Sequence, residues 1–120
     1  MKIAVTAQSH DAEGAMDGRF GRARCFAVLD DASDAWTFVD NTQNLNAAQG
    51  AGIQSARAVS ETDAEVVITG NVGPKAFATL RAAGVRVYLC DAATVREAVE
   101  AFKTGKLTET DDSNVEGHWV

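Results

Sequence analysis

The chain has 120 residues, of which 46% are hydrophobic, and a formal net charge of −6. This length and composition are typical of one globular domain with its own core, and the negative charge argues against general binding of nucleic acid. No apolar run approaches the roughly 18 residues of a membrane span, and the N-terminus lacks the basic and apolar regions of a signal peptide. The sequence therefore predicts a cytoplasmic protein that does not enter the membrane.

The charge is unevenly distributed along the chain. Residues 107–120 contain four acidic residues and no lysine or arginine, so residues 1–106 carry a net charge of only −2. Such a segment is usually a solvated chain end. We therefore expect a single domain over residues 1–107 and an acidic, mobile tail over residues 108–120.

The first third of the chain predicts three strands. Residues 2–6 form a short apolar run, and residues 25–30 and 35–40 form two more around an Asp-rich turn, which indicates a hairpin. A long loop over residues 7–24 separates the first strand from this hairpin. Loops of this length inside a compact domain usually have a function or are mobile.

The remainder predicts helices that alternate with strands. We expect helices over residues 52–61, 75–83 and 94–103, and strands over residues 65–69 and 85–90. Pro74 and Gly84 suit the two ends of the second helix. This order predicts an α/β domain with a mixed sheet. Because ligands gather beyond the carboxyl ends of parallel strands, the long loop and the turn after residue 69 should face the same edge.

The turn after residue 69 has the features of an anion-binding corner. Gly70 and Gly73 allow a ligand to approach the main chain closely. The N–H groups at the start of the following helix are unpaired within the helix, and Lys75 adds a positive charge. The alternative is an ordinary strand-to-helix turn with a solvated lysine. The local pattern does not distinguish this turn from an anion-binding site.

Three arginines lie at the end of the long loop. Arg19, Arg22 and Arg24 fall within six residues around Phe20 and Gly21. A guanidinium group is planar, always charged and a multiple donor, so a cluster of them suits a polyanion. The alternative is that these arginines neutralise acidic residues of the same loop.

Soft metal ligands are few. Cys25 and Cys90 lie far apart in the sequence. Two cysteines with this spacing form neither a zinc site nor a disulfide framework. Cys25 follows the arginines, which would lower the pKa of its thiol if they are close and make it a candidate ligand; a buried strand cysteine is the alternative. His10 and Met16, in the long loop, are the other candidates, Met16 through its thioether to copper.

Several short motifs occur in one order along the chain and resemble those of the dinitrogenase iron–molybdenum cofactor biosynthesis family, whose members are small cluster-binding and carrier domains. The resemblance covers residues 1–107 and is closest to the small stand-alone members, which include the orange proteins of anaerobic bacteria. Those proteins carry a molybdenum–copper sulfide cluster without covalent ligation. The motifs are Lys2–Thr6, Phe20–Ala23, Gly50–Gly52, Val67–Gly70, Gly73–Phe77, Ala83–Val85 and Gly105–Leu107.

The resemblance implies a ribonuclease-H-like mixed sheet of five strands in the order 3-2-1-4-5, with strand 2 antiparallel and helices on its faces. It also implies no enzymatic activity and a molybdenum-containing metal–sulfur cluster, of Mo–Cu sulfide or Fe–Mo–S type, exchanged with donor and acceptor proteins. We expect a monomer. The residues expected to bind the cluster are Arg19, Phe20, Gly21, Arg22, Arg24, Gly70, Asn71, Val72, Gly73 and Lys75.

One position departs from the family pattern. Many relatives have a histidine directly before the Phe-Gly of the first loop, where this chain has Arg19. A fixed cation at this position favours recognition by charge and hydrogen bonds over direct coordination. His10 lies earlier in the loop and does not align with the missing ligand.

Other functions fit part of the pattern. The glycine turn and the arginines would also suit phosphate or a nucleotide, although the chain has neither the GxxxxGK[ST] nor the GxGxxG spacing. A regulatory module that binds protein partners is a further alternative. An enzyme of the nuclease type has little support, because the strand ends offer Asp30 and Asp40 but no converging set of carboxylates.

Overall fold

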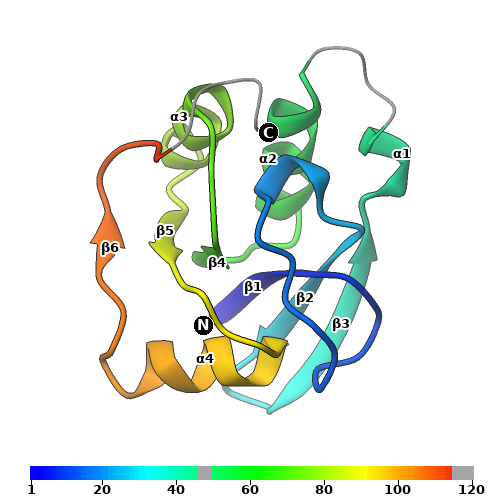
Figure 1. The fold of residues 1–120 in the computed structure, drawn as a ribbon, viewed down its shortest axis with the longest axis vertical. Coiled ribbons are helices and arrows are strands. Elements are labelled where there is room, and N and C mark those ends of the chain that lie inside the picture. Colours follow the sequence, from blue (N-terminus) through cyan, green and yellow to red (C-terminus); the bar gives the residue numbers. More distant parts are fainter. Residues whose placement is uncertain (46–49, 115–120) are drawn as a thin grey trace.

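The computed structural model describes residues 1–45 and 50–114. Its strands form one mixed sheet in the order β3-β2-β1-β4-β5-β6 (Figure 1). Strands β1, β4 and β5 are parallel to one another, while β2 runs antiparallel to β1 and β3, and β6 runs antiparallel to β5. The strands are β1 (Lys2–Ala7), β2 (Cys25–Asp30), β3 (Ala35–Asp40), β4 (Val66–Thr69), β5 (Arg86–Leu89) and β6 (Glu109–Thr110).

The order of the first five strands and the antiparallel direction of β2 are as expected. The expected number of five strands is wrong, because Glu109 and Thr110 pair with Tyr88 and Val87 and add a sixth. The likeness to ribonuclease H stays a prediction. The sheet thus extends beyond the expected domain boundary at residue 107, into the acidic tail. Residues 115–120 of that tail lie outside the described residues, and its mobility stays a prediction.

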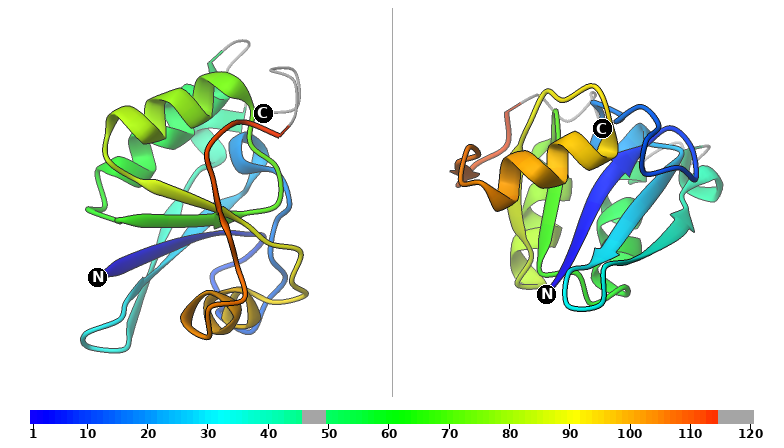
Figure 2. Two further views of the ribbon diagram at one scale, coloured as in Figure 1. Left: turned by 90° about the vertical axis from the view of Figure 1, so that its left-hand side faces the viewer. Right: turned by 90° about the horizontal axis from the view of Figure 1, so that it is seen from below.

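Helices cover both faces of the sheet. Helices α2 (Ala51–Ser60) and α3 (Pro74–Ala82) lie on one face and α4 (Val95–Lys103) lies on the other (Figure 2). A short helix, α1 (Thr42–Leu45), follows β3, and a 3-10 turn, η1 (Phe20–Arg22), precedes β2. Pro74 lies in the first turn of α3, as expected. No helix in the described part of the chain is long and apolar enough to cross a membrane.

Two hydrophobic clusters fill the two sides of the sheet. Along β1, Ala4 faces α2 and α3, whereas Ile3 and Val5 face α4, because successive side chains of a strand point to opposite faces. With helices on both sides, β1 and β4 are buried at every residue except Lys2. The core therefore leaves the ends of β1 and β4, and not their faces, accessible for binding.

Candidate functional site

The carboxyl ends of β1, β4 and β5 lie at one edge of the sheet, where the long loop meets the turn after β4 (Figure 1). The N–H of Phe20 donates to the carbonyl of Asn71 (3.0 Å), and the Nδ2 of Asn71 donates to the carbonyl of Gly18 (3.0 Å). This confirms the expectation that the arginine loop and the glycine turn face the same edge.

Gly70 allows the two segments to approach closely. A Cβ atom at this position would lie 2.8 Å from the carbonyl oxygen and 3.0 Å from the Cα of Gly18. Real Cβ atoms do not approach backbone atoms so closely, so a side chain at residue 70 would push the loop away from the turn. Gly70 is therefore required by the contact between the two segments.

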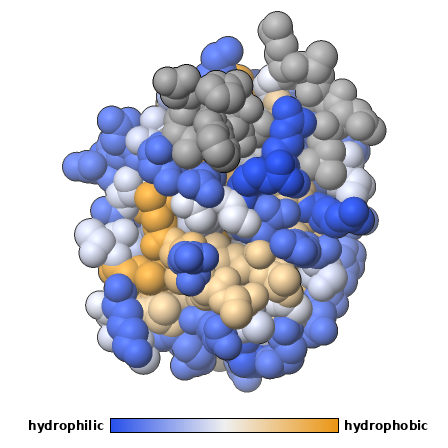
Figure 3. Space-filling model, viewed as in Figure 1, coloured by the Kyte–Doolittle hydropathy of each residue, from blue (hydrophilic) through white to orange (hydrophobic). Residues whose placement is uncertain are grey.

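A hollow of about 510 Å³, which we call the edge hollow, opens beside this contact. Figure 3 shows apolar surface over β5 and the segment between β5 and α4, and strongly hydrophilic surface over η1 close by. The hollow thus combines an apolar wall with a polar border. Its lining residues are Met16, Gly18, Gly70, Asn71, Leu89, Cys90, Asp91 and Ala92.

The edge hollow contains two sulfur-bearing side chains. Met16 is largely buried and Cys90 is half-buried, and both contribute to its lining. Burial, and secondly the charge of Asp91, raises the pKa of the Cys90 thiol, which is therefore protonated at neutral pH. Met16 had been expected as a candidate ligand; the stretch from Leu89 to Ala92 had not. The stretch from Leu89 to Ala92 lies at the end of a parallel strand, and this position is the sequence signal that could have identified it as part of the site.

The long loop is attached to the start of α4. The N–H groups of Val95 and Arg96 donate to the carbonyls of Gly14 (3.1 Å) and Ala12 (2.9 Å). The guanidinium of Arg96 also forms an ion pair with Glu13. The N-terminus of α4 is thus occupied by loop carbonyls, and the loop has a defined path over the sheet edge.

A buried polar group fixes the end of this loop. The hydroxyl of Thr6 donates to the carbonyl of Asp17 (2.5 Å) and lies 3.0 Å from the hydroxyl of Thr69. The Asp17 carboxylate is 8% exposed and accepts the N–H of Arg19 (2.9 Å). Asp17 therefore positions the backbone at which the arginine segment begins.

None of the predicted cationic residues lines the edge hollow: Arg19 lies beside its lining residue Asn71, and Arg24 lines a second hollow described below. Arg19, Arg24 and Lys75 are exposed, and none of them forms an ion pair with another residue in the ranges 1–45 and 50–114. Of the loop's own carboxylates, Glu13 pairs with Arg96, and Asp17 binds a backbone N–H. Arg22 is half-buried in η1. Like Arg19 and Lys75, it does not line the edge hollow.

Four residues expected to bind the cluster are buried, and their part in binding stays a prediction. Phe20 is fully buried, with its ring centroid 5.6 Å from that of Phe26. Gly21, Val72 and Gly73 are also buried. The apolar wall of the edge hollow comes from β5 and the residues after it, and Phe20 does not contribute to its lining.

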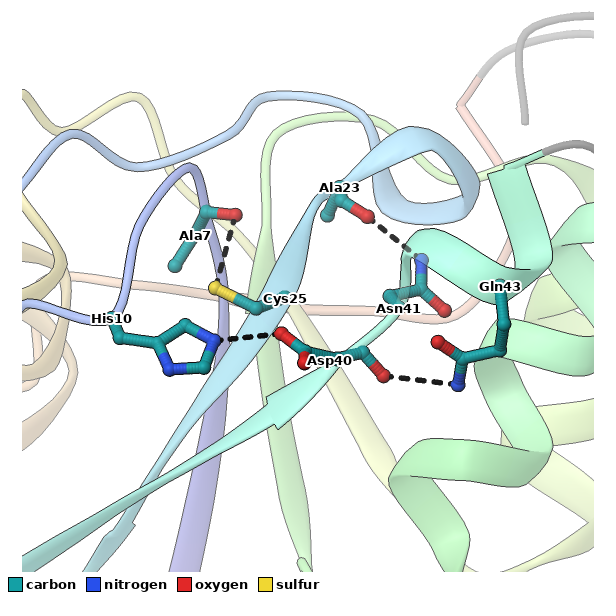
Figure 4. A network of polar contacts seen from close by, with 7 residues as sticks. All are labelled: Ala7, His10, Ala23, Cys25, Asp40, Asn41 and Gln43. Atoms are coloured by element: carbon teal, nitrogen blue, oxygen red, sulfur yellow. Dashed lines mark hydrogen bonds and ion pairs between the residues drawn. The ribbon is translucent and has the colours of Figure 1, made fainter.

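A second, smaller hollow of about 190 Å³ lies at the start of β2 and the end of β3. The Nε2 of His10 lies 2.7 Å from the Oδ1 of Asp40, and the His10 ring stacks on Phe38. Figure 4 shows these two polar side chains pointing toward each other, close to Cys25. The lining residues are Gln8, Ser9, His10, Arg24, Cys25, Asp40 and Thr42.

Cys25 does not have the lowered pKa expected from its arginine neighbours. Burial, followed by the charges of Asp40 and Asp17, raises the pKa of its thiol, and the Sγ donates to the carbonyl of Ala7 (3.6 Å). These observations favour the alternative interpretation, in which Cys25 is a buried cysteine of strand β2. The candidate ligands are also divided, with His10 and Cys25 at one hollow and Met16 at the other, and no group of three or more metal-ligating His, Cys, Asp or Glu side chains occurs within the described ranges.

The chain matches the family described as dinitrogenase iron-molybdenum cofactor over residues 1–105. The apo form of the orange protein from Desulfovibrio gigas is 42% identical, with a TM-score of 0.93 over 95% of this chain and 96% of that protein. A putative NifB protein from Thermotoga is 35% identical, with a TM-score of 0.85 over 97% and 98% of the two chains. An uncharacterized protein of Methanocaldococcus jannaschii is 26% identical over an alignment of 110 residues that covers 89% of each chain. The chain therefore belongs to the dinitrogenase iron-molybdenum cofactor family.

Proposed function

We propose that the protein binds and carries a molybdenum-containing metal–sulfur cluster at the edge hollow and catalyses no reaction on it. The observation that carries this proposal is a hollow with two sulfur-bearing side chains and an apolar wall at Leu89 and Ala92, beside the exposed guanidinium of Arg19. The family description and the similarity to the orange protein support it.

The chemistry of the edge hollow matches that of a thiometalate anion. Such anions spread several negative charges over sulfur atoms that accept hydrogen bonds weakly, so apolar contact and long-range charge hold them better than strong directed bonds. Leu89 and Ala92 supply apolar contact, and Arg19 supplies charge close to the Gly18–Asn71 junction. Binding of this kind leaves the cluster transferable between a donor and an acceptor protein.

The sulfur atoms favour a copper-containing cluster over an iron–molybdenum–sulfur one. Thioether and thiolate groups are soft ligands that suit monovalent copper, and a thiol becomes such a ligand when the bound metal displaces its proton. Met16 and Cys90 bring one of each to the edge hollow. We therefore propose a Mo–Cu sulfide cluster as the cargo, carried or stored by a monomer in the cytoplasm.

Anaerobic titration of the apo-protein with tetrathiomolybdate and copper tests the proposal. We expect a coloured species that survives desalting, with molybdenum and copper in fixed ratio to protein by metal analysis. Retention only from iron–sulfur precursors would replace the Mo–Cu cargo by an Fe–Mo–S one. Binding of nucleotide or inorganic phosphate in place of both would favour the phosphate-binding alternative, and binding of none of them would favour a regulatory role with protein partners.

Substitution of the arginine segment tests the site. The triple variant Arg19→Gln/Arg22→Gln/Arg24→Gln should lose the retained cluster and keep its fold, because the neighbouring positive charge is removed. A matched control removes the same charge at three exposed positions on α2, at the start of β5 and after α4: Arg57→Gln/Arg86→Gln/Lys106→Gln. Equal retention in the two triple variants would show that the arginine segment is not part of the site.

A further inference from the structure

The C-terminal residues 109–114, which we call the strap, run from one wall of the edge hollow to the other. The strap begins as β6, paired with β5, whose last residue Leu89 lines the hollow. It ends at Asn114, which contacts the turn formed by residues 70–72. Between these points the guanidinium of Arg81 donates to the carbonyl of Asp111 (3.0 Å). The strap therefore joins two segments that the rest of the chain brings to the hollow separately.

Asn114 forms four hydrogen bonds with the turn. Its Oδ1 accepts the N–H of Val72 (2.7 Å), and its own N–H donates to the Val72 carbonyl (3.1 Å). Its Nδ2 lies within hydrogen-bond distance of the carbonyl of Gly70 (3.3 Å) and the Oδ1 of Asn71 (3.2 Å). One side chain from the strap thus satisfies main-chain and side-chain groups of three consecutive residues.

These bonds occupy a group that the sequence suggested for anion binding. The N–H of Val72 belongs to the glycine turn and is taken by Asn114. An anion in the edge hollow would therefore not meet this N–H unless the strap moved. The turn acts on the cargo through its lining residues Gly70 and Asn71.

The strap also fixes the direction of the Asn71 side chain. The Nδ2 of Asn71 donates to the carbonyl of Gly18, and its Oδ1 accepts from Asn114. A primary amide has distinct donor and acceptor ends, so these two partners together select one orientation of the amide. Gly18, Gly70 and Asn71 all line the edge hollow, and the bond from Asn114 completes their connection.

We propose that Asn114 is a positioning residue for the edge hollow, which acts through Asn71 and the 70–72 turn and sets the rate at which the cargo is released. This inference rests on the proposed function, because it concerns how fast the cargo leaves the same edge hollow. The strap lies beyond residues 1–105, over which the chain matches its family.

Two substitutions of Asn114 test this role. Asn114→Ala removes every side-chain hydrogen bond from residue 114 to the turn. Asn114→Asp keeps an acceptor for the Val72 N–H but replaces the Nδ2 donor by a carboxylate oxygen, which faces two acceptors, the Gly70 carbonyl and the Asn71 Oδ1. Gln43→Ala is the matched control, because Gln43 is an exposed amide on α1 that donates to a main-chain carbonyl, that of Asp40 (3.1 Å). Release of a preloaded tetrathiomolybdate–copper species is followed by absorbance, and the Val72 N–H and Asn71 side-chain amide are followed by NMR.

We expect both Asn114 variants to release the species about three- to tenfold faster than the wild type, a change that corresponds to the net contribution of about one hydrogen bond. The Asn71 amide resonances should shift in both variants, and exchange of the Val72 N–H should accelerate in Asn114→Ala but much less in Asn114→Asp. The control should match the wild type in all three readouts.

The readouts separate the possible failures. Unchanged exchange of Val72 in Asn114→Ala would show that the contact does not exist in solution and would overturn the proposal. Changed amide signals with an unchanged release rate would show that the strap is structural only, which also overturns it. A wild-type protein that retains no tetrathiomolybdate–copper species would overturn the proposed function, and with it a role of Asn114 in release, while the amide signals would still establish the contact.

Discussion

Two glycines set the closest approach at the sheet edge. Gly18 and Gly70 bring the long loop against the turn after β4, and Asn71 bridges the same two segments with its side chain. Sequence alone suggested Gly70 as a point of close approach to a ligand. The structure shows that the neighbour is the main chain of residue 18, which no local pattern identifies because the two residues are far apart in the chain.

Replacing Gly70 with alanine should therefore destabilise the protein. The new Cβ would meet backbone atoms 2.8–3.0 Å away, which cannot rotate aside as a side chain can. We expect a loss of about 1–3 kcal/mol in the free energy of unfolding, measured by urea denaturation. Gly18→Ala is the control, since its nearest new contact would be an ordinary 3.8 Å from Asn71 Nδ2. Equal stability of the two variants would contradict the steric argument.

The thiol of Cys25 leads to a prediction on pH. Because its pKa is raised in the folded protein by burial and by two carboxylates, the folded state favours the protonated thiol. The resulting stability is fully present below the ordinary thiol pKa of about 8.5 and is lost as the pH rises from there through the folded-state pKa. Unfolding measured between pH 7 and 10 should show this decline, and it should be smaller in Cys25→Ala.

Alkylation provides an independent check on the same thiol. Cys90 also has a raised pKa but is half-buried, whereas Cys25 is 1% exposed. Iodoacetamide at pH 8 should therefore modify Cys90 well before Cys25, as followed by mass spectrometry of the peptides. Faster modification of Cys25 would restore the original hypothesis of an arginine-activated thiol.

Among the elements, the strands and helices with clear hydrophobic periodicity were predicted to within one or two residues. The three elements that were missed, β6, α1 and the 3-10 turn η1, are short. β6 has two residues, Glu109 and Thr110, with no apolar pattern, and it forms because the edge of β5 offers free main-chain groups. α1 has four residues and follows the buried Asn41, whose side chain donates to the carbonyl of Ala23 and accepts from Ser55. Such elements depend on tertiary contacts.

The site was predicted only in part, because the residues that line it are also set by tertiary contacts. Arg19 and Phe20 are adjacent in sequence, and the composition of their loop predicts both at one binding surface. In the structure Phe20 is buried in the core and Arg19 is exposed, while the main chain between them bonds to Asn71. Adjacent residues of an extended segment face opposite ways, so the loop could be identified from its composition but its lining residues could not.

The N-terminus of α4 connects the long loop to the rest of the fold. Thr94 precedes the helix, and its hydroxyl accepts the N–H of Glu97 (3.1 Å). Thr94→Ala should cost about 1 kcal/mol of stability and accelerate amide exchange at Val95, whose N–H bonds to the loop. Thr94→Ser should retain both properties. Unchanged exchange in the alanine variant would show that the loop, and not the cap, holds this helix end.

The whole molecule is compact, with a Cα radius of gyration of 12.5 Å, and within residues 1–45 and 50–114 Met1 is the only large hydrophobic side chain that is exposed. The edge strand β3 carries Trp36 and Phe38, but the guanidinium of Arg96 lies over the Trp36 ring and the His10 ring stacks on Phe38. These neighbours shield the apolar side chains of an edge that could otherwise pair with another chain.

We therefore expect a monomer of 12.6 kDa in solution. Sedimentation or light scattering at micromolar concentrations should give this mass, and Arg96→Ala should raise the tendency to associate by exposing Trp36. A concentration-dependent dimer of the wild type would show instead that β3 is used for pairing.

The attachment of the long loop to α4 has a thermodynamic consequence. Loops that become ordered on capturing a ligand lose conformational entropy at that moment, and the observed affinity is reduced accordingly. Here the main-chain groups of Ala12, Gly14 and Arg19 already have hydrogen-bond partners within the protein itself. Capture should therefore proceed with little loss of chain entropy and a small change in heat capacity. Discrimination among anions would then depend on the fixed shape of the edge and not on its adaptation to each of them.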